Sequence, residues 1–378
     1  MDVDKFIQII GADFFTGVPD SQLKALCNYL FDKYGVNNKH HIIAANEGNS
    51  VALAAGYHLS TGKVPVVYMQ NSGEGNAINP ITSLINDNVY AIPVIFIIGW
   101  RGEPNVHDEP QHIFQGKITL KLLEILDLDY FVLSKDTTKE EVTNQMIKFN
   151  CLLKQGKSVA FVVKKDALFY SKKVEYKNDA SITREEAIKH IIKNCRNDFV
   201  ISTTGKASRE LFEIREQNKQ GHDYDFLTVG SMGHCSSIAL GAALNIPNKK
   251  IWCIDGDGSI LMHMGSMAVI GKIKPNNLIH IVINNFSHET VGGMPTVSDG
   301  INLVEIAKAC GYKYTVSVDN YEDLEKELNV AKNLKGLSFI EIKCLLGSRK
   351  DLGRPTLLPT ENKKLFMQML KKANNNTW

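Results

Sequence analysis

The sequence predicts an α/β protein made of two doubly wound domains, each built on a mainly parallel sheet. Helical and extended apolar periods alternate through both halves of the 378 residues, as they do where helices cover a parallel sheet. The extended segments are almost continuously apolar, which is typical of strands that are buried on both faces. A polar stretch without an apolar period, 171–180, divides the two halves. We therefore expect domains at 1–170 and 183–378, joined by a linker at 171–182.

The first half contains apolar runs and helical patterns in alternation. The runs predict buried strands at 64–69, 92–98 and 159–163. Helical spacing of apolar residues predicts helices from about Leu23 to Gly35, at 117–126 and at 139–153. A stretch rich in small residues, 50–56, is expected to be helical as well.

In the second half, Thr183 and Glu186 have the spacing of a capping box, which predicts a helix at 184–195. Apolar runs predict strands at 199–202, 250–254, 278–283 and 338–342. In such sheets, ligands bind at the carboxyl ends of the strands. The candidate site segments are therefore those that follow apolar runs: 17–21, 70–75, 203–206 and 255–259.

Composition restricts the class of partner. Hydrophobic residues make up 44% of the chain and charged residues 22%, with a formal net charge of +2, as in soluble globular proteins. So small a charge does not attract nucleic acid or anionic lipid. The amino terminus lacks the features of a secretory signal, and the most apolar stretch, 91–99, is too short to span a bilayer. Scattered cysteines without a CxxC pair indicate reduced thiols, so we expect a cytoplasmic protein.

Asp257 and Asn285 form the sharpest chemical pattern. Asp257 follows the strand at 250–254, and Asn285 follows the strand at 278–283. Two neighbouring strand ends would bring them together. Mg2+ prefers oxygen ligands, usually one or two carboxylates together with phosphate oxygens. We predict a magnesium site formed by Asp257, the amide oxygen of Asn285 and the backbone carbonyl of Ser287.

The residues around Asp257 suit a bound phosphate group. Gly256 and Gly258 would let the backbone approach closely, and the helix that opens at Ser259 would point its amides toward the phosphate. Thr204 and Gly205, which follow the strand at 199–202, are candidates for the same role. A Gly-Asp-Gly turn by itself is usually only a turn, and the Asn pair after the next strand makes the functional reading the better one.

This Gly-Asp-Gly and Asn-Asn pattern resembles the cofactor signature of thiamine diphosphate enzymes. The resemblance implies thiamine diphosphate and Mg2+ as cofactors, a pyrimidine-binding domain at 1–170 and a diphosphate-binding domain at 183–378. It implies that Glu47, which precedes the small residues at 50–56, activates the cofactor. It also implies that the Gly230 carbonyl accepts a hydrogen bond from the cofactor and that Met232 holds it bent. Without the resemblance, Glu47 reads equally well as a solvated helix-terminal carboxylate and Met232 as a core residue.

Further motifs resemble the phosphonopyruvate decarboxylases among these enzymes: 17–21, 46–49, 71–73, 101–104 with 108–112, and 292–296. This resemblance implies non-oxidative decarboxylation of 3-phosphonopyruvate to phosphonoacetaldehyde and carbon dioxide, in phosphonate biosynthesis. Sulfopyruvate decarboxylase is similar in both halves, but these are typically separate subunits, so a single chain favours the phosphonate. Phe286 departs from the pattern, because glycine often follows the Asn pair.

The reaction implied requires a proton donor, for which Asp20, His112 and His288 are candidates. Asp20 reads equally well as a helix N-cap. The phosphonate requires cations and neutral hydrogen-bond donors. We expect these to be Arg101, Lys206, Ser21 and Gln115, although either basic residue alone reads more readily as a solvated surface charge.

Three other interpretations compete with this one. A decarboxylase of sulfopyruvate or another short 2-oxo acid would share the cofactor site. A dinucleotide-dependent oxidoreductase is disfavoured because no G-x-G-x-x-G opens a helix after a strand and because Asp257 lies where a pyrophosphate would bind. A binding module that has lost catalysis is disfavoured by Glu47, Asp257 and Asn285. The resemblance also implies a homo-oligomer whose active sites lie between subunits and take a small anionic 2-oxo acid.

Overall fold

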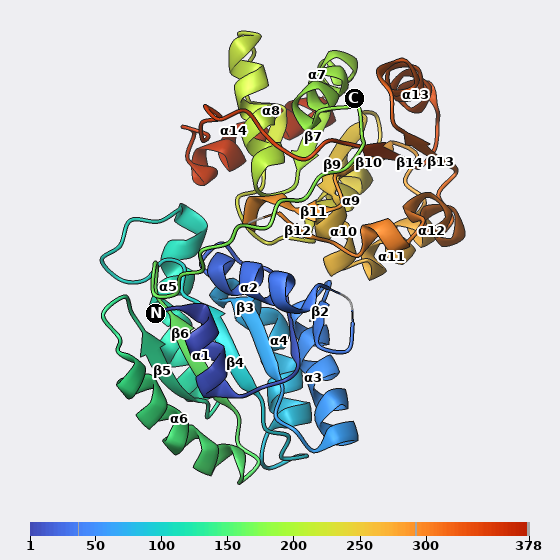
Figure 1. The fold of residues 1–378 in the computed structure, drawn as a ribbon. Helices are drawn as coiled ribbons and strands as arrows, with labels where there is room; N and C mark the ends of the chain where they lie inside the picture. The colour runs from blue at the N-terminus through green and yellow to red at the C-terminus, as the bar shows by residue number, and fades with distance from the viewer. Residues whose placement is uncertain (37, 292, 376–378) are drawn as a thin grey trace. The chain divides into compact units, whose positions relative to one another are not determined.

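The computed structural model describes residues 1–36, 38–291 and 293–375. The chain forms two compact units, Met1–Glu175 with Thr290–Pro295 and Tyr176–Glu289 with Thr296–Trp378. Each unit contains a six-stranded parallel sheet with helices on its faces (Figure 1), which confirms the predicted fold class. Gly292, in the predicted motif at 292–296, lies outside the described residues. Within the described ranges, no helix has the length and apolar character needed to cross a membrane.

The sheet of the first unit has the strand order β2-β1-β3-β4-β6-β5. Its strands are β1 (Phe15–Gly17), β2 (His41–Ile43), β3 (Val66–Gln70), β4 (Ile95–Gly99), β5 (Asp129–Leu133) and β6 (Val159–Val163). Its helices are α1 (Val3–Ile10), α2 (Lys24–Tyr34), α3 (Glu47–Thr61), α4 (Glu74–Pro80), α5 (Pro110–Ile125) and α6 (Lys139–Leu153). The apolar runs correspond to β3, β4 and β6. The short strands β1 and β2 and the partly exposed β5 were not predicted.

Aromatic and aliphatic side chains of alternate strand residues cover the two faces of this sheet. Phe161 of β6 contacts Phe6 of α1 and Phe149 of α6, each at 5.2 Å between ring centroids. The neighbouring residues of β6, Ala160 and Val162, belong to the core cluster that includes residues of α3. The period of two along the strand therefore places helices on both faces.

The sheet of the second unit has the order β13-β14-β10-β9-β7-β8. Its strands are β7 (Phe199–Ser202), β8 (Asp225–Leu227), β9 (Ile251–Gly256), β10 (Leu278–Asn284), β13 (Tyr314–Val318) and β14 (Ser338–Lys343). Its helices are α7 (Arg184–Cys195), α8 (Lys206–Gln217), α9 (Cys235–Asn245), α10 (Asp257–Met262), α11 (Gly265–Ile273), α12 (Leu303–Cys310), α13 (Tyr321–Asn333) and α14 (Pro359–Asn375). The outer strands β8 and β13 were not predicted.

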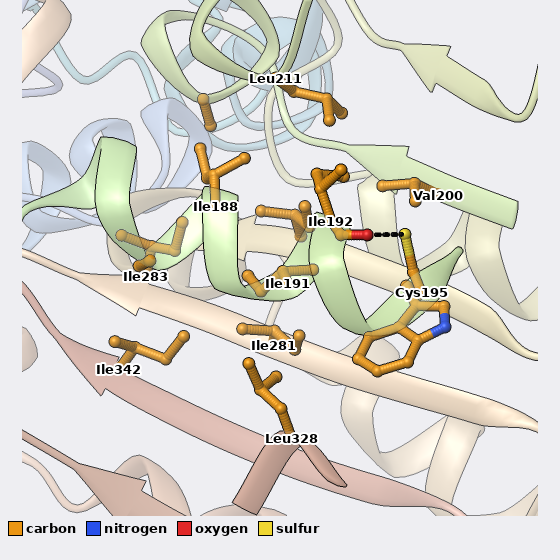
Figure 2. Packing of buried hydrophobic residues seen from close by; sticks show 14 of the residues in the cluster. Ile188, Ile191, Ile192, Cys195, Val200, Leu211, Ile281, Ile283, Leu328 and Ile342 are labelled. Atoms are coloured by element: carbon orange, nitrogen blue, oxygen red, sulfur yellow. Dashed lines mark hydrogen bonds between the residues drawn. The ribbon is translucent and has the colours of Figure 1, made fainter. Parts of the chain in front are cut away.

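Alternation along β9 divides the core of this unit into two layers. Trp252 and Ile254 pack with residues of α7 and α8, and Cys253 packs with residues of α9 on the opposite face. Figure 2 shows the first layer, in which isoleucines of α7 meet those of β10 and β14. Strands buried in this way hold the ends of β7, β9 and β10 at one edge of the sheet.

Only one of the two hydrogen bonds of the capping box predicted for α7 forms, so the prediction is wrong for the other. Thr183 does cap the helix, because its side chain accepts from the Glu186 backbone amide at 3.2 Å. The Glu186 carboxylate, however, pairs with Lys189 at 2.6 Å, and the Thr183 amide donates to the Tyr321 hydroxyl at 3.3 Å. A tertiary partner of the Thr183 amide and a neighbour of Glu186 on the same helix therefore replace the second hydrogen bond of the box.

Candidate active site

Each sheet has a switch point, a strand whose two neighbours in the sheet are reached by connections that leave in opposite directions. In the first unit, β1 lies between β2 and β3, and in the second, β7 lies between β8 and β9. Connections that leave in opposite directions open a crevice at the carboxyl ends of these strands, where ligands bind. The predicted segments 17–21, 70–75, 203–206 and 255–259 follow these strands.

In the second unit, side-chain hydrogen bonds join the predicted segments 203–206 and 255–259 to the loop that holds Gly230 and Met232. The Ser259 hydroxyl accepts from Thr203 Oγ1 at 3.0 Å and from the Gly233 amide at 3.1 Å. The Thr204 hydroxyl donates to the Val229 carbonyl at 2.8 Å, next to Gly230. The strand ends at 203–205 and 256–259 and the loop at 230–233 therefore form one cluster.

Asp257 begins α10 and is held by two hydroxyl groups. Its Oδ2 accepts from Thr296 at 2.6 Å and from Ser298 at 3.1 Å, and only 3% of the residue is exposed. Burial raises the pKa of Asp257 to about 6, although the hydroxyl groups oppose this rise. Both hydroxyls donate to the same oxygen, so Oδ1 takes neither bond. The sequence included Thr296 in a motif but indicated no role for it or for Ser298.

Asn285 and Ser287 follow β10 beside Asp257. Ile283 of β10 pairs with Gly256 of β9, so the residues after both strands leave the same edge. Asn285 is buried, donates from Nδ2 to Glu289 at 2.9 Å and accepts on Oδ1 from the Ser287 amide at 3.1 Å.

The donor set fits a magnesium ion that also binds phosphate oxygens. A carboxylate oxygen, an amide oxygen and a backbone carbonyl are the hard oxygen ligands that Mg2+ selects. Space is available as well: a Cβ at Gly256 would meet nothing closer than Thr203 Cγ2 at 3.9 Å. Residues after β9 and β10 could therefore hold this ion.

Met232 and His288 meet over Gly258. A Cβ at Gly258 would lie 3.0 Å from the His288 ring and 3.2 Å from the Met232 methyl group. Burial lowers the pKa of His288 to about 4, so its imidazole is neutral at neutral pH. Phe286 has φ of 61°, a left-handed conformation that favours glycine, so the departure from the pattern leaves the backbone strained.

In the first unit, Glu47 is the first residue of α3 and is buried, with 5% of its surface exposed. Burial raises its pKa, and Asn76 donates to its Oε2 at 2.8 Å. A Cβ at Gly73 would lie 2.5 Å from Oε1. The absence of a side chain at Gly73 therefore makes room for the carboxyl group, and the reading of Glu47 as a solvated carboxylate is wrong.

Asp20 is completely buried between the ends of β1 and β3. Gln70 donates to Oδ1 at 2.5 Å and the Gln22 amide to Oδ2 at 3.1 Å. Burial raises the pKa of Asp20 to about 6. The N-cap interpretation is wrong, because α2 begins at Lys24 and neither Asp20 nor Ser21 is its N-cap. Gln70 belonged to a predicted segment, but nothing in its spacing indicated the contact.

Arg101 and Ser21, both predicted to bind the substrate, lie in contact with each other. Arg101 Nη1 donates to the Ser21 hydroxyl at 3.0 Å, and Nε and Nη2 pair with Asp108 at 2.8 and 2.5 Å. The Gln115 amide donates to the Asn71 carbonyl at 3.0 Å. His112 has no hydrogen-bond partner at Nδ1 among the described residues, and burial, then Arg101, lower its pKa to about 4.

Lys206, in the second unit, pairs with Glu289 at 2.5 Å. The side chains of Lys206 and Arg101 are 22% and 20% exposed. Reading either one as a solvated surface charge is therefore wrong. Each cation is already neutralised by a carboxylate, so an anionic ligand would share it with that partner.

Glu74 is a buried acid that the sequence did not single out. Only 1% of it is exposed, and neither carboxyl oxygen has a hydrogen-bond partner among the residues that the structure describes. Burial raises its pKa to about 8, and the nearby Gln115 amide offsets this only in part. Its position in the segment 70–75 was the available signal.

Comparison with protein families matches both units to thiamine pyrophosphate (thiamine diphosphate) enzymes. The N-terminal TPP binding domain of these enzymes matches residues 5–123. The C-terminal TPP binding domain matches residues 203–342. The two models therefore cover the segments that hold Glu47 and Asp257.

Similarity to characterised proteins extends over nearly the whole chain. The chain is 33% identical to a phosphonopyruvate decarboxylase of Streptomyces viridochromogenes over 94% of this chain and 91% of the relative. It is 32% identical to that of Streptomyces hygroscopicus, over 95% and 90%. It is 28% identical to a sulfopyruvate decarboxylase of Methanosarcina acetivorans, over 97% of both. Since this last relative matches end to end, a single chain does not distinguish the two substrates, contrary to our argument from the sequence.

Proposed function

Because the chain belongs to the thiamine diphosphate-dependent 2-oxo acid decarboxylases, we propose that its substrate is 3-phosphonopyruvate and its metal Mg2+. The products would be phosphonoacetaldehyde and carbon dioxide. The observation that carries the choice of substrate is the higher identity to two phosphonopyruvate decarboxylases than to the sulfopyruvate enzyme, over similar lengths. Sulfopyruvate is the second candidate. A dinucleotide-dependent oxidoreductase is set aside, because both family matches are to domains that bind thiamine diphosphate.

The second unit would hold the diphosphate through its metal. Asp257, Asn285 and the Ser287 carbonyl are the proposed ligands, with the two hydroxyl groups on Asp257 keeping its carboxylate in one orientation. When bound, thiamine diphosphate supplies the nucleophile and electron sink that decarboxylation of a 2-oxo acid requires. Gly230 and Met232 would position its central part.

Glu47 would hold a proton at the pyrimidine ring of the cofactor. Its buried position favours the protonated form, and the Asn76 amide orients the carboxyl group. A carboxyl group whose pKa is raised by burial holds a proton more readily, which suits a group that exchanges a proton with the ring. Gly73 lets the group sit directly against the backbone of the first unit.

Asp20 is the proposed proton donor to the product carbon. With a pKa of about 6 it is protonated in part near neutral pH, whereas His112 and His288, at about 4, are neutral bases. This favours Asp20 over either histidine as the acid. His112 and His288 would instead accept hydrogen bonds within the site.

Arg101 with Ser21 is the proposed anchor for the phosphonate. A guanidinium group binds a phosphonate through paired hydrogen bonds, and Ser21 adds a neutral donor. Asp108 fixes the guanidinium plane but also neutralises it, so Arg101 would share its charge. Lys206 and Gln115 remain proposed contributors.

The first experiment measures carbon dioxide release with thiamine diphosphate and Mg2+, using phosphonopyruvate, sulfopyruvate and pyruvate in parallel. We expect phosphonopyruvate to give the highest kcat/KM. Glu47→Gln should lose roughly 100-fold or more in kcat, as expected when an acid–base group is removed. Glu124→Gln, an exposed position on α5, is the matched control. Preference for sulfopyruvate would refute the substrate, and activity of Glu47→Gln equal to that of the control would refute its role.

A further inference from the structure

Glu289 lies at the centre of a partly buried charge network in the second unit. Its Oε1 accepts from Lys206 at 2.5 Å, and its Oε2 accepts from Arg184 at 2.6 Å and from Asn285 Nδ2 at 2.9 Å. Arg184 also forms a bidentate pair with Glu210, with both bonds at 2.7 Å. Two cations thus face two carboxylates, and the Asn285 amide is attached to this neutral cluster.

The network decides which end of the Asn285 amide faces which way. A carboxylate that faces two cations is ionised and can only accept hydrogen bonds, so the amide atom beside Glu289 is the nitrogen. The other end faces the Ser287 amide, a donor, at 3.1 Å, so that end is the oxygen. Both neighbours therefore select the same orientation.

This orientation matters for metal binding. The two ends of an amide have nearly the same shape, but the oxygen can bind a cation and the NH2 group cannot. An amide free to flip would present the wrong end for part of the time. The ion pair between Glu289 and Arg184 does not by itself explain why Glu289 contacts Asn285. The Arg184 guanidinium already forms two hydrogen bonds with Glu210.

We infer that Glu289 is a positioning residue for the Asn285 metal ligand: it holds the amide nitrogen and so keeps the amide oxygen available for the cation. The inference rests on the proposed function, in which Asn285 binds the metal. It assigns to Glu289, and to the cations Lys206 and Arg184 that hold it, a part in metal affinity.

The test measures Mn2+ binding by electron paramagnetic resonance, with saturating thiamine diphosphate. Glu289→Met removes the acceptor and should weaken Mn2+ binding roughly 10- to 100-fold, as loss of a residue that orients a metal ligand does. Glu210→Gln is the matched control, because Glu210 contacts the same Arg184 but not Asn285. Its Mn2+ affinity should equal that of the wild type, with folding of each variant checked by circular dichroism.

A second arm separates positioning from a structural role. In an Asn285→Asp background the ligand has two equivalent oxygens and needs no orientation, so Glu289→Met should no longer weaken Mn2+ binding. A residue that only supports the fold would cause the same loss in both backgrounds. If Glu289→Met does not fold, Glu289→Gln should show the same pattern with a smaller loss.

Each outcome points to a definite conclusion. Equal losses in the two backgrounds, or a loss in Glu210→Gln as large as in Glu289→Met, would overturn the role of Glu289 and leave the metal site standing. Asp257→Asn tests the site itself. If the wild type bound no Mn2+, or if Asp257→Asn bound it as well as the wild type, both the proposed site and the inference would fall.

Discussion

Buried carboxyl groups are the dominant residue-scale feature of this protein. Asp20, Glu47, Glu74 and Asp257 are each at most 5% exposed, and none of them forms an ion pair among the described residues. A buried carboxyl group without a cationic partner favours its protonated form. Such groups are concentrated where acid–base chemistry takes place, and three of these four were predicted to be in the site.

The first prediction concerns Gly73, whose lack of a side chain leaves room for Glu47. In Gly73→Ala the new Cβ would lie 2.5 Å from Glu47 Oε1, so the carboxyl group must move. A displacement of about 1 Å can cost about 100-fold in rate, and we expect kcat to fall by roughly that factor. Because the displaced group is the end of a flexible side chain, the free energy of unfolding should change by less than about 1 kcal/mol.

Gly75→Ala is the control for Gly73→Ala, since a Cβ there meets nothing within 4 Å. Steady-state kinetics and urea unfolding of both variants check the prediction. Full activity in Gly73→Ala would contradict the prediction, because it would show that catalysis does not depend on the position of the Glu47 carboxyl group.

Glu74 links stability to pH. Burial on folding raises the pKa of Glu74 from its ordinary value of 4.5 to about 8. The folded state therefore binds the proton more tightly than the unfolded state, so the stability attributable to Glu74 falls as pH rises from about 4.5 to about 8. Glu74→Gln should remove this dependence and raise the free energy of unfolding at pH 8 by about 1–3 kcal/mol, with little effect at pH 4.5.

Urea unfolding of the wild type and Glu74→Gln across this pH range measures the effect. Glu140→Gln, at an exposed position of α6, is the control. A constant difference between wild type and Glu74→Gln at every pH would contradict a raised pKa at Glu74.

At the scale of elements, the helix ends show how local sequence acts. Thr138 and Glu141 form a complete capping box at the start of α6, with the Glu141 amide 3.2 Å from the Thr138 hydroxyl and the Thr138 amide 2.7 Å from the Glu141 carboxylate. At α7, Tyr321 and Lys189 take over half of the same pattern. Among the residues that the structure describes, no tertiary partner competes for the exposed box, so it forms fully.

Removal of the α6 cap gives a prediction at this scale. Thr138→Ala should lower the free energy of unfolding by about 1 kcal/mol, because the Glu141 amide loses its acceptor. Thr143→Ala, within the same helix, is the control, since its hydroxyl donates only to the Lys139 carbonyl of its own helix. Thermal and urea unfolding compare the two. Equal effects in both variants would refute a specific capping contribution.

At the scale of the whole molecule, we propose a homo-oligomer whose active sites combine the first unit of one chain with the second unit of another. Glu47→Gln and Asp257→Asn inactivate different units. In a mixed dimer, one site would carry both substitutions and the other neither. Co-expression of the two inactive variants should therefore restore roughly a quarter of wild-type activity, if subunits of a symmetric dimer associate at random.

Carbon dioxide release by the co-expressed and the separately purified variants tests this. Analytical ultracentrifugation shows whether the chain associates at all. Activity that stays at the level of the separate variants, in a sample proven to contain mixed oligomers, would contradict shared active sites.

The sequence by itself determined the long buried strands and the division of the chain into two halves. Continuous apolar runs are typical of parallel strands that are covered on both faces. It also singled out Asp257 and Asn285, since these follow two predicted strands, whereas Glu47 was predicted only from the resemblance to a family. It did not indicate the short strands β1, β2 and β8, because each has only three residues, too few to show a pattern of alternation.

Only the tertiary structure decided how the site residues are held. Gln70 contacts Asp20 across 50 positions, and Thr296 contacts Asp257 across 39. Glu289 contacts Arg184 across 105 positions. Burial, and with it the raised pKa of Glu74, likewise depends on segments that meet only after folding. Such contacts leave no local period in the sequence, because a side chain's partner is selected by the packing of distant elements.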